Sequence, residues 1–224
     1  MSYTTTFEAA ASPKYQFQLI GPKGLPDVTM LWNKAKNSLQ EGKEHHLKPL
    51  SDKNLSLHSE SGYPVVGMVD SLRNRLVAVL LLTPGSAAVN EEYKPVSVTE
   101  MPGEWQKDTH AIIQCVAADP DYKKQGLAKA LLAFSEEYAT TIGIRHLFAK
   151  VAHDNIPSQG AFWKADYVPV LETSGKYGER QYAASYFSKA VAAQGLALSE
   201  IPVFNGCHVN DNSLAQDSRS LSPV

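Results

Sequence analysis

The order of apolar and polar residues along the chain predicts strands alternating with helices. Tyr15 to Ile20 alternate in polarity, as a half-buried strand does. Apolar residues at helical spacing predict amphipathic helices over about 28–40, with Asp27 as N-cap, and over Gly126 to Ile142. Nearly continuous apolar runs predict strands covered on both faces. These runs are Val65 to Val69, Leu76 to Leu82, His110 to Ala118 and Arg145 to Ala152.

The C-terminal third predicts a short helix and two more strands. Ile156 to Ala165 has a helical pattern, Tyr167 to Leu171 reads as a short strand, and Glu179 to Phe187 alternates. Two stretches give no clear pattern, residues 41–62 and those beyond about 195. The resulting order of elements is typical of an α/β layered domain built on a mixed sheet.

Composition narrows the class of protein. The chain has 224 residues, 43% of them hydrophobic and 20% charged, with a net charge of −2. These values predict a globular protein and speak against a nucleic-acid binder. Cys115 and Cys207 do not form a disulfide framework or a zinc site, and no signal-peptide or membrane-spanning pattern is present. We therefore expect a cytoplasmic protein with no metal and no membrane partner.

The division of the chain follows from the same patterns. Residues 1–13 are rich in Thr, Ala and Ser and predict a flexible arm, and residues 191–224 predict a tail. The folded domain is expected over 14–190.

One segment combines strand, turn and helix in a way that favours phosphate binding. After the strand that ends at Ala118, Asp119-Pro120 stops the pattern and Gly126 opens a helix. The first amides of a helix are unpaired and carry a partial positive charge, and Gly126 has no side chain to block a ligand. Lys123 and Lys124 add positive charge. Neither the nucleoside-triphosphate loop nor the dinucleotide fingerprint occurs in the chain.

Two motifs resemble those of the GNAT superfamily of acyltransferases. Lys123-Lys124-Gln125-Gly126-Leu127-Ala128 resembles its acyl-CoA motif [QR]-x-x-G-x-[GA], with Lys123 where Gln or Arg is usual. Asn155 to Tyr167 resembles the family's N-x-x-[AS]-x-x-x-[YF]-x-x-x-G-F segment, although Asp166-Tyr167 replaces Gly-Phe. The motifs stand in the family's order, and the resemblance spans about 15–188.

The resemblance implies a particular sheet and acetyl-CoA as the acyl donor. The expected sheet is mixed, mostly antiparallel and twisted, with fourth and fifth strands that splay around the pantetheine arm of acetyl-CoA. Backbone groups of Cys115, Val116 and Ala117 would hold that arm and polarise the thioester carbonyl. Asn155 and Phe162 are assigned to the same site. The pyrophosphate would bind to Lys123, Lys124, Gln125, Gly126, Leu127 and Ala128.

The implied reaction is N-acetylation of a primary amine by direct attack in a ternary complex. A base must deprotonate the amine, and His110 is the first choice, with Glu104 and Asp108 as alternatives. His153 and Asp154 are second choices. Many family members protonate the leaving thiolate with a Tyr. That position is Phe162 here, and Tyr167 is the substitute considered. A thiol within an apolar strand behaves as a small hydrophobe, so Cys115 is not expected to be a nucleophile.

The sequence does not identify the amine that accepts the acetyl group. The connection over about 84–109 contains acidic residues and lies where the family commonly builds its acceptor site, and Tyr93 and Trp105 in it either contact substrate or anchor the loop. A small-molecule amine and a peptide amine both fit, and a homodimer is not excluded. Two other functions stay open, transfer of a longer acyl chain, as in acyl-homoserine lactone synthesis, and non-catalytic binding of acyl-CoA.

Overall fold

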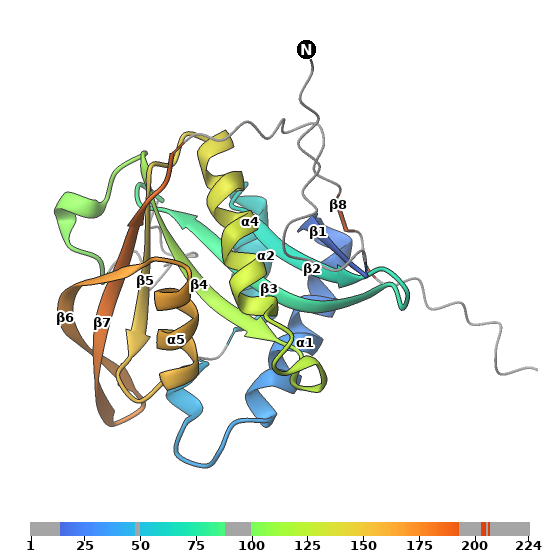
Figure 1. Ribbon diagram of the computed structural model, residues 1–224, viewed down its shortest axis with the longest axis horizontal. Helices are drawn as coiled ribbons and strands as arrows, with labels where there is room; N and C mark the ends of the chain where they lie inside the picture. The colour runs from blue at the N-terminus through green and yellow to red at the C-terminus, as the bar shows by residue number, and fades with distance from the viewer. Residues whose placement is uncertain (1–13, 48–49, 88–99, 193–202, 205, 207–224) are drawn as a thin grey trace, which may run out of the picture.

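An eight-stranded sheet forms the centre of the computed structural model, which describes residues 14–47, 50–87, 100–192, 203–204 and 206. Its strand order is β6-β7-β5-β4-β3-β2-β1-β8 (Figure 1). Only β4–β5 and β1–β8 pair in parallel, so the predicted mixed and mostly antiparallel sheet is confirmed. The strands are β1 Tyr15–Ile20, β2 Val65–Asp70, β3 Arg75–Pro84, β4 His110–Ala118, β5 His146–Ala152, β6 Val168–Tyr177, β7 Arg180–Ala190 and β8 Val203–Phe204.

Helices cover both faces of the sheet. α4 (Leu127–Thr141) and α5 (Ile156–Lys164) lie in front of it in Figure 1, and α1 (Leu25–Asn37) and α2 (Asp52–Glu60) lie behind. Short 3-10 turns occur at Pro22–Gly24, Glu44–His46, Gly103–Trp105 and Pro120–Tyr122. None of the helices in the described part of the chain is long and apolar enough to cross a membrane.

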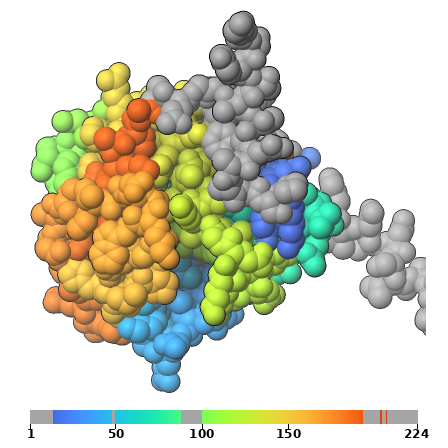
Figure 2. Space-filling view, in the orientation of Figure 1, coloured from blue at the N-terminus to red at the C-terminus, as the bar shows by residue number. Residues whose placement is uncertain are grey.

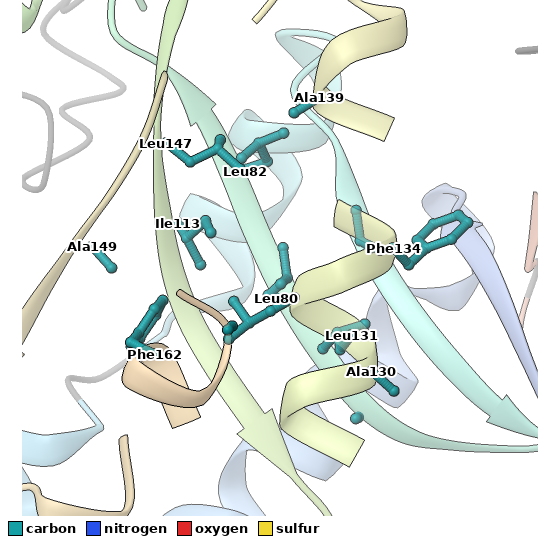
Figure 3. Close-up of a cluster of buried hydrophobic side chains, with 14 of the residues drawn as sticks. Leu80, Leu82, Ile113, Ala130, Leu131, Phe134, Ala139, Leu147, Ala149 and Phe162 are labelled. Carbon is teal, nitrogen blue, oxygen red and sulfur yellow. The ribbon is translucent and has the colours of Figure 1, made fainter. Parts of the chain in front are cut away.

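Each face of the sheet has its own hydrophobic core. On the front, α4 packs Leu131 toward Leu80 of β3 (Figure 3), whereas Phe134 stacks on Phe17 of β1 with ring centroids 4.7 Å apart. Behind the sheet, α1 and α2 bury a second cluster that includes Trp32 and Ala117. The apolar runs of β3 and β4 therefore face protein on both sides, which explains why these strands lack alternation in the sequence.

Three local predictions need correction. α1 begins at Leu25, because Pro26 fits the first helical turn, and Asp27 therefore lies inside the helix instead of capping it. Residues 41–62 contain α2, which the side chain of Ser51 caps by accepting from the amide of Asn54. β6 extends well beyond Leu171, because an edge strand can carry polar side chains while its backbone pairs with β7.

The arm and the tail predicted on either side of the domain are only partly described. Residues 1–13 and most of the predicted tail lie outside the described residues. Within the tail, Val203–Phe204 forms β8 and pairs in parallel with Leu19 and Ile20 of β1.

Candidate functional site

A bulge interrupts β4 at the residues that were predicted to hold the thioester. Leu81 pairs with Gln114 and Val79 with Ala117, so Cys115 and Val116 together face the single residue Leu80. Cys115 adopts φ +56°, a left-handed conformation that a non-glycine residue rarely takes. Such a bulge places two residues of one strand opposite a single residue of its partner and bends the bulged strand locally.

β4 and β5 separate next to this bulge. The two strands pair from His110 and His146 as far as Ile112 and Phe148, and both then continue without pairing to each other. We call the end of these two strands at which they pair the closed end, and the end at which they have separated the open end. The bulge lies at the open end, three residues beyond the last pair. The sheet therefore has a gap between β4 and β5 next to the bulge, as the splayed strands of the prediction require.

The loop from β4 to α4 has the backbone of an anion-binding turn. Lys124 and Gly126 both adopt left-handed conformations, with φ of +64° and +74°. Gly126 is the N-cap of α4, no side chain caps the helix, and its first turn has no acidic residue. Residues 123–126 are exposed. The first amides of α4 are thus open to an anionic ligand, with Lys123 and Lys124 adjacent.

A buried carboxylate, that of Asp119, supports the start of this loop. Asp119 accepts from Arg75 at 2.6 Å, pairs with Lys34 at 2.7 Å and accepts from the amide of Asp121 at 3.0 Å. Its side chain is fully buried, so the three contacts fix the start of the loop. An open pocket of about 310 Å³ adjoins the loop and includes Arg75 and Gln125 in its lining. No local pattern in the sequence indicates this support, because its members are scattered along the chain.

His110, the first choice for the base, lies at the closed end. His110 pairs with His146 there, and its Nδ1 is 3.1 Å from the carbonyl oxygen of Trp105. Burial lowers its pKa, although the hydrogen bond to Trp105 opposes the effect. Cys115 is five residues further along β4, roughly 16 Å at strand spacing. An acyl group at the bulge would be out of direct reach of His110, whose role as a base stays a prediction.

Tyr167 is also far from the bulge. It precedes Val168, which pairs with Ser188, and Ser188 pairs with Phe148 at the closed end. Its side chain is 1% exposed, and burial raises its pKa well above the usual range, which makes the phenol a weaker acid. Phe162 packs against it with ring centroids 5.1 Å apart and is itself buried in the core.

Asn155 stands at the open end and begins α5. Its side-chain oxygen accepts from the amide of Ser158 at 3.2 Å, so it acts as the N-cap of the helix. The side-chain oxygen of Asn155 already accepts this hydrogen bond, so the side-chain NH2 group is the part that a ligand can contact.

The described part of the connection before β4, residues 100–109, covers the back of the closed end. Trp105 stacks on Phe148 with centroids 4.4 Å apart, so it anchors the connection to the sheet. Glu104 and Asp108 are exposed, and Glu100 pairs with Lys150 at 2.7 Å. Tyr93, Glu91 and Glu92 lie outside the described residues.

A cluster that the sequence did not predict gathers beside Asp154. His45 Nε2 and His46 Nε2 lie 2.8 and 2.9 Å from its Oδ1, and Lys43 Nζ lies 2.6 Å from its Oδ2. Arg180 of β7 is 3.9 Å away. Two histidines and a carboxylate are metal-ligand types, but Lys43 and Arg180 place two positive charges beside the same carboxylate and disfavour a cation there.

Comparisons with known proteins agree with this geometry. The model of the Acetyltransferase (GNAT) family matches residues 29–167, whereas none of the curated proteins matches the chain. A probable acetyltransferase from Staphylococcus epidermidis superposes with a TM-score of 0.60 at 15% identity, over 80% of this chain and 99% of that one.

Two further solved structures have the same fold. The ribosomal-protein-S18-alanine N-acetyltransferase of Escherichia coli has a TM-score of 0.58 at 16% identity, over 82% of this chain and 98% of that one. The structure of yncA from Salmonella typhimurium with its cofactor acetyl-CoA has a TM-score of 0.58 at 12% identity, over 82% and 97%. Because the family match covers more than half of its length, the chain belongs to the GNAT acetyltransferase family.

Proposed function

We propose that the protein is an N-acetyltransferase that moves the acetyl group of acetyl-CoA to a primary amine by direct attack in a ternary complex. The observation that carries the proposal is the bulge at Cys115 and Val116, placed where β4 and β5 separate and next to the strand end that leads to α4. A thioester and a pyrophosphate are the two chemical features of acetyl-CoA, and these two places in the fold match them.

The α4 end of the site suits a pyrophosphate. A Cβ at Gly126 would meet no protein atom within 4 Å, so the space in front of the helix amides is open to a ligand. Unpaired amides, the helix dipole and two lysines all favour negative charge there. A donor bound by its pyrophosphate at Gly126 would run its pantetheine arm along β4 toward the bulge.

The bulge supplies what the acyl carbon needs. Attack by the amine nitrogen forms a C–N bond and places negative charge on the carbonyl oxygen. Backbone amides at Cys115, Val116 and Ala117 are the donors we assign to that oxygen. When the intermediate collapses, the C–S bond breaks, the CoA thiolate leaves and the amide product retains the acetyl group.

Departure of the thiolate does not require a tyrosine acid. A CoA thiol resembles a cysteine thiol, whose pKa is about 8.5, so the thiolate is a tolerable leaving group near neutral pH. This accounts for Phe162 at the position where many relatives have Tyr. Tyr167 does not replace it in this scheme, because it is buried at the closed end.

Binding and turnover with defined donors test the proposal. We expect acetyl-CoA to raise the melting temperature of the protein, and S-acetylpantetheine, which lacks the pyrophosphate, to have much less effect. Thiol release should then accelerate with at least one amine from a panel of amino acids, polyamines and peptides. Absence of stabilisation by any acyl-CoA would refute the donor site, whatever the amine.

A second function is favoured by one observation. Phe162 has no proton to donate and Tyr167 is buried, so neither offers an acid at the open end. A non-catalytic module that binds acyl-CoA would have this property. Stabilisation by acetyl-CoA without thiol release for any amine would support that module over the enzyme.

A further inference from the structure

The segment between α1 and α2 crosses the gap between β4 and β5 on the back of the sheet. We define residues 42–47 as the bridging segment. Leu47 packs against the same hydrophobic cluster as Cys115 and Ala117 of β4, whereas His46 contacts Asp154, two residues past the end of β5. The bridging segment therefore reaches from the bulged strand to its neighbour at the open end.

This position lies opposite the donor side. α4 and α5 cover the front of the sheet, and the phosphate-binding turn belongs to α4 (Figure 1). α1 and α2, which hold the bridging segment, lie behind. In Figure 2 the light-blue atoms that follow α1 lie along the lower edge, between the orange atoms around α5 and the yellow-green β4–α4 loop. A donor that enters from α4 leaves this side of the gap to the acceptor amine.

Two other segments hold the bridging segment in place, the β5–α5 turn and the start of β7. Lys43 and both histidines contact Asp154 of the β5–α5 turn, and the carbonyl of Gly42 accepts from Arg180 at the start of β7. Burial alone would raise the pKa of the Asp154 carboxyl, but hydrogen bonds from Lys43 and the two histidines together lower it. The carboxylate is thus ionised and accepts Nε2–H from the imidazoles.

This arrangement makes the two histidines unequal. When Nε2 carries the proton that Asp154 accepts, Nδ1 becomes the basic nitrogen of each neutral ring. His45 is fully buried, and its Nδ1 is buried without a hydrogen-bond partner in the described structure. Its ring packs on Tyr182 with centroids 4.8 Å apart, so His45 is a packing element. The side chain of His46 keeps 9% of its surface exposed, and no buried unpaired nitrogen is found on it in the described structure.

We propose that His46 is the proton acceptor for the amine substrate, with Asp154 as the residue that positions it. This inference rests on the proposed function. Nδ1 of His46 takes one proton from the acceptor ammonium, and the neutral nitrogen attacks the thioester carbon. After the C–S bond breaks, the second amine proton passes to the CoA thiolate, and His46 returns its proton to solvent. An aspartate that fixes the tautomer of a histidine base has the same task in other enzymes.

The electrostatic surroundings of His46 include groups from every element packed around it. These facing groups are Lys43, Glu44 and His45 of the bridging segment, Asp154 of the β5–α5 turn, and Arg180 and Tyr182 of β7.

Substitution of His46 tests the inference. In His46→Gln we expect kcat to fall about 100-fold or more, which is the usual loss for a general base, while the KM for acetyl-CoA stays within about twofold. The acid limb of the kcat/KM profile should disappear, and activity should recover at high pH, where the amine is already neutral. In His46→Ala, added imidazole should restore part of kcat. His146→Gln, an exposed histidine at the closed end, should behave as wild type.

Two results would overturn the inference without touching the donor site. In one, His46→Gln keeps the kcat and pH profile of an active wild type. In the other, the acid limb disappears in His110→Gln or His153→Gln instead. Loss of acetyl-CoA binding in both His46 variants, with no rescue by imidazole, would assign His46 a structural role only. An inactive wild type would refute the proposed function and this inference together. Asp154→Asn should retain acetyl-CoA binding but shift the acid limb.

Discussion

The chain contains a matched pair of glycines that separates backbone strain from ligand contact. Gly126 precedes α4 with φ +74°, and Gly143 follows the same helix with φ +83°. A Cβ at either position would meet no atom within 4 Å, so substitution by Ala introduces no clash at either site. What remains is the left-handed conformation, which costs an L-residue about 1–2 kcal/mol. In a chain of this size that corresponds to a drop in Tm of roughly 2–8 °C.

The two variants should differ only in their response to acetyl-CoA. A ligand at 100 times its Kd stabilises the native state by about 2.7 kcal/mol, and Gly143→Ala should retain this gain. In Gly126→Ala the methyl group occupies the space in front of the helix amides. A tenfold loss of affinity would remove about 1.4 kcal/mol of that gain.

Thermal unfolding of both variants with and without acetyl-CoA provides the measurement. Without ligand, the two Tm values should fall by similar amounts. With ligand, only Gly126→Ala should show a reduced shift. Equal ligand-induced shifts in the two variants would refute the assignment of Gly126 to the pyrophosphate and leave it as a turn residue only.

Three other predictions concern the support of the β4–α4 loop, the pH dependence of the stability, and the role of the Cys115 thiol. Arg75→Gln removes a charged hydrogen bond from Asp119 and should raise the KM for acetyl-CoA by up to about tenfold with kcat nearly unchanged. An equal loss in kcat would contradict a role confined to the loop. Burial lowers the pKa of His58 from 6.5 to about 4. The unfolded chain therefore binds more protons between these values, and stability, complete above pH 6.5, should fall by roughly 3 kcal/mol toward pH 4. Urea titrations of wild type and His58→Phe check this, since the variant should lose that part of the slope. Cys115→Ala should keep the thiol-release rate within about threefold, and a loss of a hundredfold would indicate a covalent intermediate.

The turn before α4 could be predicted from the sequence because its features have local signals. Gly126 marks a left-handed turn, and the apolar stripe of α4 follows at once. The bulge at Cys115 has no such signal, because a non-glycine residue with positive φ looks like any other apolar residue of the run. Its position was obtained from the family resemblance alone.

The contacts of the bridging segment could not be predicted for a different reason. The bridging segment is polar and has no period, so local patterns say nothing about it. Its partner Asp154 lies 108 positions beyond His46, and only the folded sheet brings the two together. Asp154 was considered as a base in its own right, whereas in the structure its oxygens are already occupied by Lys43 and the histidines.

The long-range contacts of the bridging segment also bear on how the protein is made. Gly42 contacts Arg180 across 138 positions, and β5 enters the sheet between β4 and β7. Contacts of such separation are among the slowest to form in folding. During synthesis, the β4–α4 loop would be exposed well before β7 has been translated. The chain should therefore bind acetyl-CoA only weakly, and transfer nothing, until its C-terminal strands have docked and Arg180 holds the bridging segment in place.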